Sequence, residues 1–172
     1  MSNTYYPYAF RLNGRRLCLL WGAGHGKDPD DVVLDDEGRL PVFETPDAAS
    51  VYASRRGLGF VDKDCVEPID LDALTEWLAR PTDKIDCPTL LNAWNIFGDV
   101  ATALNGVRTH IDERQHGHLY DKLFFGLNLP AVTPEGQHYE PGWSDEEVGI
   151  LVDLLGPWLI KFRRLIQPVV IK

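Results

Sequence analysis

Residues 8–21, YAFRLNGRRLCLLW, decide the fold of the first part of the chain. Two short apolar runs flank the dipeptide Asn13-Gly14, and this pair readily adopts the positive φ angles that a two-residue β-turn requires. The pattern therefore predicts strands at about residues 7–12 and 15–21, joined as a β-hairpin.

The sheet is expected to continue after this hairpin. The segment VVLDDEGRLPVFET, residues 32–45, contains Asp36-Glu37-Gly38 between two apolar runs, which is typical of a turn between short strands. A further strand is expected near residues 66–69. These elements predict a small, mostly antiparallel sheet.

One helix is expected within the sheet region. In TPDAASVYASRRG, Thr45 is a good N-cap and Pro46 is a good first helical residue, whereas Gly57 favours a stop. These signals predict a helix over about residues 46–56, packed on the sheet.

The hydrophobic period changes from two to three and four beyond Asp70. The segment IDLDALTEWLARP, residues 69–81, offers an aspartate N-cap and a stop at Pro81. The segment DCPTLLNAWNIFGDVATALN, residues 86–105, then predicts a second helix with one apolar face. A polar stripe lies beside that face and consists of Asn92, Asn95 and Asp99.

The last part of the chain is expected to be helical as well. HLYDKLFFG, residues 118–126, predicts a short helix, and WSDEEVGILVDLLGPWLIKFRRLI, residues 143–166, predicts a long one. Ser144 and Glu147 form a capping-box pattern at its start. Pro157 lacks an amide donor, so the pattern predicts a kink or a split at this point.

These elements together predict an α+β fold. The chain is expected to form a single domain over residues 1–172, with a sheet-rich part at 1–70 and a helical part at 71–172. The helical layer would complete one core with the sheet.

The composition indicates a folded protein with an acidic surface. The 172 residues are 44% hydrophobic and 10% aromatic, enough to bury a core without metal or disulfide, so no cofactor and no metal are expected. The formal net charge is −9 and the pI is about 4.9. This charge argues against a general nucleic-acid binder, because neutralising phosphates requires lysines and arginines on one surface. It suits a basic protein partner instead.

The cysteines and the N-terminal residues indicate a cytoplasmic protein. Cys18, Cys65 and Cys87 are odd in number and far apart, which fits neither a disulfide framework nor a zinc site. The segment MSNTYYPYAFRLNGRRL lacks a continuous apolar signal, and no run approaches the roughly 18 apolar residues of a membrane span. We therefore expect a reducing cytoplasm and no membrane contact.

Three signatures of chemistry are present but weak. The glycine-rich WGAGHGKD is followed by Asp28-Pro29, which lacks the spacing and the Ser or Thr of a phosphate-binding loop. Cys87 precedes Pro88 at an expected helix start, where helix capping or burial explains it as well as a reactive thiol does. The remaining candidates, without metal-ligand spacing, are His110, His116, His118 and His138.

The connection at residues 126–143 is rich in prolines and aromatic residues. Pro130, Pro134 and Pro141 restrict its freedom, so an ordered loop is expected, with its aromatic side chains buried against the helix at 88–105. Its polar groups would be satisfied by the stripe of Asn92, Asn95 and Asp99. A stapled crossover without any ligand explains these features equally well.

Parts of the chain resemble a known group of proteins. LLNAWNIFGDVATAL, residues 90–104, and YDKLFFGLNLPAVTPEGQHYEPGWSDEEV, residues 120–148, look like small acidic immunity proteins encoded beside bacterial polymorphic toxins, including those of contact-dependent growth inhibition systems. VFETPDAASVYASRRGL, residues 42–58, is similar to α/β modules in the same group. The resemblance implies a cytosolic antidote without catalytic residues. It would bind a cognate toxin domain, for example a basic nuclease, and block the active site or the access of substrate.

The expected contact surface follows from the acidic loops. Acids in loops can face a partner without disturbing the core, and interface hot spots favour tyrosine. The candidate partner-binding residues are Asp28, Asp30, Asp31, Asp35, Asp36, Glu37, Asp62, Asp64 and Tyr139. Two other interpretations stay open: an acidic adaptor for another protein, and a small cytosolic enzyme whose polar pocket forms around Asn92, Asn95 and Asp99, with His118 and Tyr120.

Overall fold

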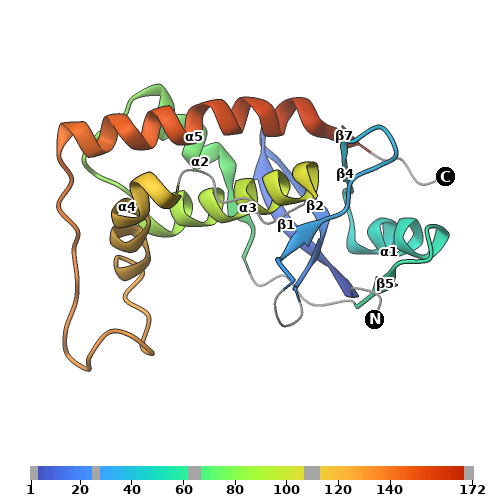
Figure 1. Ribbon diagram of the computed structural model, residues 1–172, viewed down its shortest axis with the longest axis horizontal. Helices are drawn as coiled ribbons and strands as arrows, with labels where there is room; N and C mark the ends of the chain where they lie inside the picture. Colours follow the sequence, from blue (N-terminus) through green and yellow to red (C-terminus); the bar gives the residue numbers. More distant parts are fainter. Residues whose placement is uncertain (1–3, 25–27, 62–66, 107–112, 169–172) are drawn as a thin grey trace.

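The computed structural model describes residues 4–24, 28–61, 67–106 and 113–168, and Figure 1 shows its helices and strands. The described strands are β1 (Thr4–Leu12), β2 (Arg15–Gly22), β3 (Asp31–Val32), β4 (Leu40–Val42), β5 (Gly59–Phe60), β6 (Ile69–Asp70) and β7 (Ile166–Pro168). The helices are α1 (Pro46–Arg55), α2 (Leu71–Ala79), α3 (Cys87–Asn105), α4 (Glu113–Phe125) and α5 (Asp145–Leu165). The α+β class and the helical C-terminal region are confirmed.

The sheet is built on the predicted hairpin. β1 and β2 pair antiparallel from Tyr5 opposite Gly22 to Leu12 opposite Arg15, and the turn between them has φ angles of 54° at Asn13 and 69° at Gly14. β3 adds antiparallel to β2, while β5 and β6 pair parallel with β1. The sheet is therefore mixed, although the hairpin gives it most of its antiparallel pairs.

The two faces of the sheet bury different side chains. Successive residues of a strand point to opposite faces of the sheet. On one face, Phe10 and Leu19 belong to a large cluster with Phe97 of α3 and Phe162 of α5. On the other face a smaller cluster packs against α1 and consists of Cys18, Leu20, Val33, Phe43, Ala49 and Ala53. The buried residues thus form two clusters, not the single core expected from the sequence, since the sheet lies between α1 and the helical layer.

The helix starts agree with the sequence signals. Thr45 accepts a hydrogen bond from the amide of Ala48 at the start of α1, and Asp70 accepts one from Ala73 at the start of α2. At α5 the capping box is complete: Ser144 accepts from the amide of Glu147, and the Glu147 carboxylate accepts from the amide of Ser144. These contacts satisfy amides that have no partner within a helix.

The last helix differs from expectation at both its middle and its end. α5 runs unbroken through Pro157, so the predicted split is wrong; the proline is solvent-exposed, where water can hydrate the carbonyl that loses its amide donor. Beyond α5 the chain is not helical, because β7 pairs parallel with β4. This pairing ties the C-terminal end of α5 to the N-terminal half of the chain.

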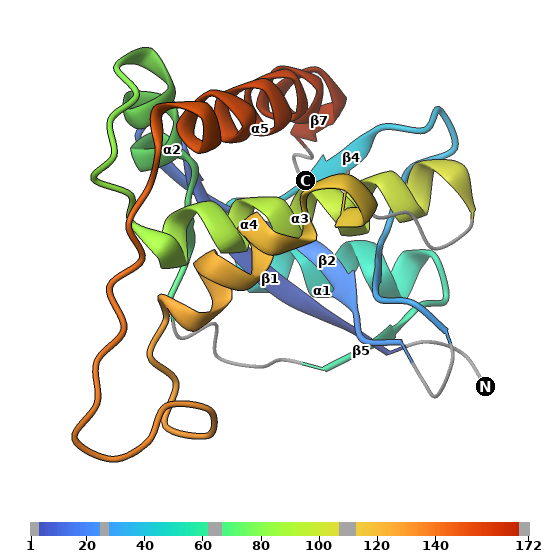
Figure 2. The same cartoon turned by 60° about the vertical axis from the view of Figure 1, so that its left-hand side comes forward.

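Residues 126–143 form a projecting loop that we call the arm. Figures 1 and 2 both show it extending away from the helical layer between α4 and α5. Tyr139 is 42% exposed and Trp143 is only partly buried. The prediction that the aromatic side chains of this loop are buried against α3 is therefore wrong for Tyr139, whereas Trp143 packs against the larger buried cluster without being fully buried. The prolines stiffen the loop, but the α3 face that was expected to receive it is already covered by α4, through contacts such as Trp94 with Tyr120.

Candidate partner-binding surface

Three aromatic side chains form a shelf at one end of the hairpin. Tyr6 lies opposite Trp21 in the β1–β2 register, and their ring centroids are 6.2 Å apart. Tyr8 stacks on Trp21 at 5.6 Å. All three rings point to the face of the sheet that α3 covers, because Tyr6 and Tyr8 are two residues apart on β1 and Trp21 is paired with Tyr6. All three are only partly buried. We call Tyr6, Tyr8 and Trp21 the aromatic shelf.

Asp99 of α3 lies against this shelf. Its carboxylate accepts a hydrogen bond of 2.9 Å from Nε1 of Trp21. Burial raises the pKa of Asp99 to about 6; the Trp21 hydrogen bond opposes this rise, and the charges of Asp30 and Asp31 add to it. Among the described residues, the Asp99 carboxylate is thus held in a partly buried site beside Trp21 and the charges of Asp30 and Asp31, which disfavours its charged form.

The acids that follow β2 approach the same place. Asp31 pairs with Gly22 at the edge of the sheet, and burial, together with the nearby Asp30, raises its pKa. Its Oδ1 is buried without a hydrogen-bond partner among the described residues. Asp28 and Asp30 are exposed, and the carboxylate of Asp30 accepts a hydrogen bond of 2.8 Å from the amide of Gly24.

A second group of predicted acids is neutralised within the molecule. Asp35 accepts hydrogen bonds from the backbone amides of Glu37 and Arg39. The guanidinium of Arg39 also forms ion pairs with the carboxylates of Asp35 and Glu37. Although burial acts to raise it, these bonds hold the pKa of Asp35 below its usual value. Asp36 pairs with Arg56 at 2.6 Å. These three acids therefore offer a partner much less free negative charge than their number indicates.

The structure consequently divides the predicted contact residues into separate groups. In the described part of the chain, Asp28, Asp30 and Asp31 form no ion pair. We call these three residues the open acid cluster. Tyr139 lies on the arm, which Figures 1 and 2 place at the opposite end of the molecule from β5. The other two predicted residues, Asp62 and Asp64, lie outside the described residues.

The polar stripe on α3 is not one pocket. Asn92 is exposed. Asn95 accepts a hydrogen bond of 2.9 Å from the hydroxyl of Tyr120, and Asp99 accepts one from Nε1 of Trp21. The stripe thus fastens α4 and the sheet to α3. Asn95 and Asp99 bind different neighbours and Asn92 is exposed, which weakens the interpretation of the stripe as an enzymatic site.

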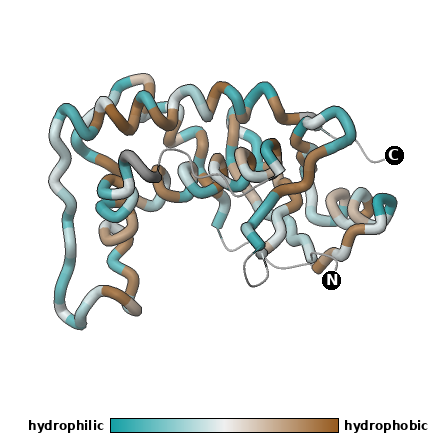
Figure 3. Tube along the Cα trace, in the orientation of Figure 1, coloured by the Kyte–Doolittle hydropathy of each residue, from teal (hydrophilic) through white to brown (hydrophobic). Residues whose placement is uncertain are grey.

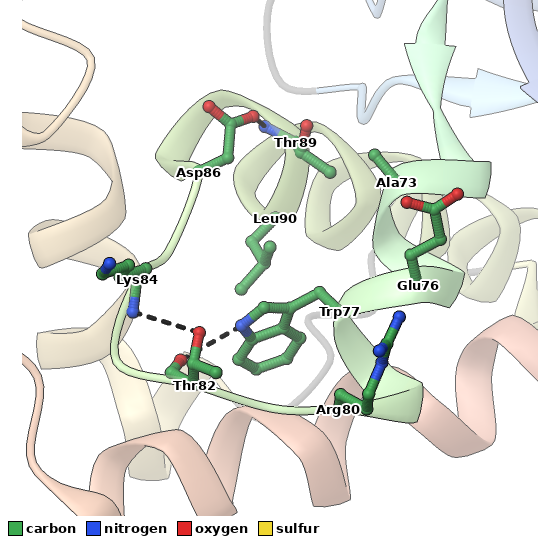
Figure 4. Close-up of a pocket in the computed structure, with 9 residues that line it drawn as sticks. All are labelled: Ala73, Glu76, Trp77, Arg80, Thr82, Lys84, Asp86, Thr89 and Leu90. Carbon is green, nitrogen blue, oxygen red and sulfur yellow. Dashed lines mark hydrogen bonds between the residues drawn. The ribbon is translucent and has the colours of Figure 1, made fainter.

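Two pockets lie elsewhere, near the start of α3. The larger, about 570 Å³, lies between α2 and α3, and Figure 4 shows Trp77 and Leu90 forming its apolar floor. The Nε1 of Trp77 donates to the carbonyl of Thr82 at 3.1 Å. Its charged lining residues, Glu76, Arg80, Lys84 and Asp86, are of both signs, so they define no preferred ligand charge.

The smaller pocket, about 420 Å³, lies between the segment before α3 and the base of the arm. Cys87 is among its lining residues, but burial raises the pKa of this thiol, which disfavours a reactive thiolate. Among the described residues, no group of three His, Cys, Asp or Glu side chains is placed to hold a metal ion. No described helix is long and apolar enough to cross a membrane.

The contact between the shelf and Asp99 is the part that the sequence did not predict. The cross-strand pairing of Tyr6 with Trp21 follows from the Asn13-Gly14 turn once the register is counted outward from it. The meeting of Trp21 with Asp99 has no such local signal, because it depends on how α3 crosses the sheet.

Comparison with protein-family models, with curated proteins and with solved structures finds no match for this chain.

Proposed function

We propose that this chain is an immunity protein that acts in the cytoplasm and binds a cognate bacterial toxin domain without turnover. Binding would occlude the active site of the toxin or the access of its substrate. The observation that carries the proposal is the open acid cluster, whose three carboxylates form no ion pair within the described part of the chain. Asp30 and Asp31 of this cluster act on Asp99, which lies against the partly exposed aromatic shelf.

The chemistry of this surface supports a basic protein as the partner. Uncompensated carboxylates speed the encounter with a positively charged surface. Partly exposed tyrosine and tryptophan supply the large contact areas that dominate binding energy at interfaces. The overall charge of −9 adds to the same attraction, and the resemblance of residues 90–104 and 120–148 to immunity proteins points to the same class of partner.

The enzymatic alternative has less support. Neither pocket described above is lined by Asn92, Asn95 or Asp99, although the raised pKa of Asp99 is a property that catalytic acids share. Stoichiometry separates the two functions: an immunity protein protects only up to a ratio of one molecule per toxin, whereas an enzyme that inactivates the toxin protects at a small fraction of that ratio.

The test begins with the neighbouring gene: the proposal predicts that a toxin is encoded immediately upstream, and the domain encoded there is then used for co-expression and binding. We expect growth protection, inhibition complete at a 1:1 ratio, and association that slows as salt rises, because salt screens the charges. A chain that neither binds nor protects would show the proposal to be wrong.

A matched pair of charge reversals tests the surface itself. Asp28→Lys/Asp30→Lys and Asp36→Lys/Glu37→Lys change the net charge by the same amount at exposed positions. We expect the first variant to slow association about tenfold at low salt and the second to slow it clearly less. Equal slowing by both variants would mean that only the overall charge matters and that the open acid cluster is not the contact surface.

A further inference from the structure

The arm carries an unusual share of the exposed apolar side chains. Of the seven large hydrophobic residues with exposed side chains in the described part of the chain, four lie on the arm or at its junction with α4: Phe125, Leu129, Val132 and Tyr139, at 39–47% exposure. Figure 3 shows hydrophobic colouring on the outer part of this loop. A concentration of exposed apolar side chains on one element marks an interaction surface.

The arm is held in shape by its own hydrogen bonds. The amide of Tyr139 donates to the side-chain oxygen of Asn128 at 2.7 Å, and the side-chain nitrogen of Asn128 donates to the carbonyl of Tyr139 at 3.0 Å. This reciprocal pair closes the neck of the loop. Within it, the amides of Val132 and Thr133 donate to the carbonyl of Leu129. The apolar side chains are therefore presented by a preformed loop, which lowers the entropy lost on binding.

The base of the arm is fixed by one lysine. Nζ of Lys122 donates to the carbonyl of Gly142 and to both carboxylate oxygens of Glu147, at 2.7 and 2.8 Å. It also lies 4.6 Å from the ring centroid of Trp143. The arm thus leaves α4 and enters α5 in a fixed direction.

The arm and its flanks are strongly acidic. Residues 119–147 contain six acids and a single basic residue, Lys122, a net charge of −5 within a chain of −9. Lys122 is paired with Glu147. The other five acids of this segment therefore have no lysine or arginine within the segment to balance them. Glu135, His138 and Glu140 of the arm are exposed.

The molecule itself does not cover these apolar side chains. Tyr139 lines a pocket of about 420 Å³ between the base of the arm and the segment before α3, but it is still 42% exposed. Leu129 and Val132 belong to neither of the two buried clusters. Their exposure lowers solubility without adding to the stability of the fold, which is expected of a surface that a partner covers.

We propose that the arm inserts into the active-site cleft of the toxin domain, a cleft with an apolar floor and a rim of lysine and arginine. Such a rim is what a nuclease uses to hold phosphates, and the acidic arm complements it. This inference rests on the proposed function and adds a second contact with the same toxin domain: the open acid cluster, at the other end of the molecule, speeds the encounter, and the arm occupies the cleft. A second copy of this chain is a poor occupant, since each arm carries Glu135 and Glu140 without a lysine or arginine, and the longer segment 119–147 has a net charge of −5, so these segments of two copies repel each other.

The test compares two sets of apolar truncations by binding kinetics with the upstream toxin domain. Leu129→Ser/Val132→Ser/Tyr139→Ser removes the apolar surface of the arm, and leaves the neck intact because only the backbone of Tyr139 takes part in it. Val51→Ser/Ile160→Ser is the matched control, at exposed positions on α1 and α5. We expect dissociation about tenfold faster or more for the arm variant and within about twofold of wild type for the control.

A second variant loosens the arm without removing its contact side chains. Asn128→Ala breaks the neck and places a residue with a Cβ and no local hydrogen bonds at a φ of 51°. We expect weaker binding by about fivefold or more because the loop must then be ordered on binding, with an unchanged circular dichroism spectrum of the folded protein.

The outcomes separate the two proposals. If wild type binds and protects but the arm triple variant dissociates at the wild-type rate, the arm inference is wrong and the immunity function stands. If wild type does not bind the toxin domain, both are wrong. If light scattering shows a dimer of wild type that the arm triple variant abolishes, the occupant is a second copy and the inference is equally wrong.

Discussion

At the sheet end of the molecule the carboxylate of Asp99 lies against Trp21 and faces Asp30 and Asp31, whereas at the arm end the carboxylate of Glu147 receives two hydrogen bonds from Lys122. Burial raises the pKa of Asp99 to about 6. The Lys122 hydrogen bonds, with the amide of Ser144, lower the pKa of Glu147. The charged form of a carboxyl group is thus disfavoured at the sheet end and stabilised at the arm end.

The two ends therefore use their acids differently. At the sheet end burial and the acids near Asp99 raise its pKa, so its charged form lowers the stability of the folded protein. Compensated acids at the arm end fix the direction of a loop. At the arm end, what is left uncovered is apolar side chains such as Leu129 and Val132.

The largest effect is expected from truncating the tryptophan at the sheet end. Trp21→Ala removes the stacking with Tyr8 and leaves the carboxylate of Asp99 without its 2.9 Å donor. We expect a loss of about 3 kcal/mol in the free energy of unfolding at pH 7, the low end for large aromatic truncations because Trp21 is only partly buried. Urea denaturation measures it.

Trp21→Phe is the control for this change. It keeps a ring on Tyr8 and removes only the hydrogen bond, so the loss should be smaller while the pKa of Asp99 rises further. A loss below about 1 kcal/mol for Trp21→Ala would contradict the view that the shelf and Asp99 are coupled.

The next effect is a gain in stability at the same end. Because the folded-state pKa of Asp99 is raised from 3.8 to about 6, its contribution to stability is fully present below pH 3.8 and is lost as pH rises through about 6. Asp99→Asn still accepts from Trp21 but carries no charge. We expect this variant to be more stable than wild type by on the order of 2 kcal/mol at pH 7, with the gain disappearing towards pH 4.

Stability measured from pH 4 to 7 checks this prediction, together with an NMR titration of the carboxyl group. Asp30→Asn/Asp31→Asn should lower the pKa of Asp99, since both charges act to raise it. A wild-type protein with the same pH profile as Asp99→Asn would contradict the structure at this site.

The two ends also differ in how far the sequence predicts them. The hairpin and the starts of the helices depend on neighbours in the chain, so Asn13-Gly14, Thr45 and the Ser144 capping box could be identified from short patterns. The pairing of β7 with β4 has no such signal, because three residues after a long helix contain nothing that specifies a distant strand.

The candidate site follows the same rule. The acids of the loops could be counted in the sequence, but which of them are neutralised depends on Arg39 and Arg56, and Arg56 reaches Asp36 only once α1 is packed on the sheet. The arm could be recognised by its prolines. Its exposure could not, since that depends on α4 occupying the face of α3 that the arm was expected to cover.

A smaller effect is expected from the tryptophan at the arm end. Trp143 is partly buried and contacts the ammonium of Lys122 at 4.6 Å from its ring centroid. Trp143→Ala should lower the free energy of unfolding by about 1–2 kcal/mol, whereas full burial would give about 3–5. Thermal unfolding beside Trp21→Ala compares the two tryptophans directly; a larger loss for Trp143 would show that the arm is packed more tightly than its exposure indicates.

The smallest effect is expected at the satisfied carboxylate. Glu147→Gln keeps the capping box, because glutamine also accepts from the amide of Ser144, but it removes the ion pair with Lys122. We expect a loss of about 1 kcal/mol at pH 7, since the pair is one-fifth exposed and hydrogen-bonded on both oxygens. Because the folded-state pKa of Glu147 is lowered from 4.5, its stabilisation is present above that value and is lost as pH falls through the folded pKa. At low pH, the free energy of unfolding of Glu147→Gln should therefore no longer be lower than that of wild type, and that of Asp99→Asn should no longer be higher. If both variants instead differed from wild type in unfolding free energy as much at pH 3 as at pH 7, the opposite pKa shifts assigned to Asp99 and Glu147 would be wrong.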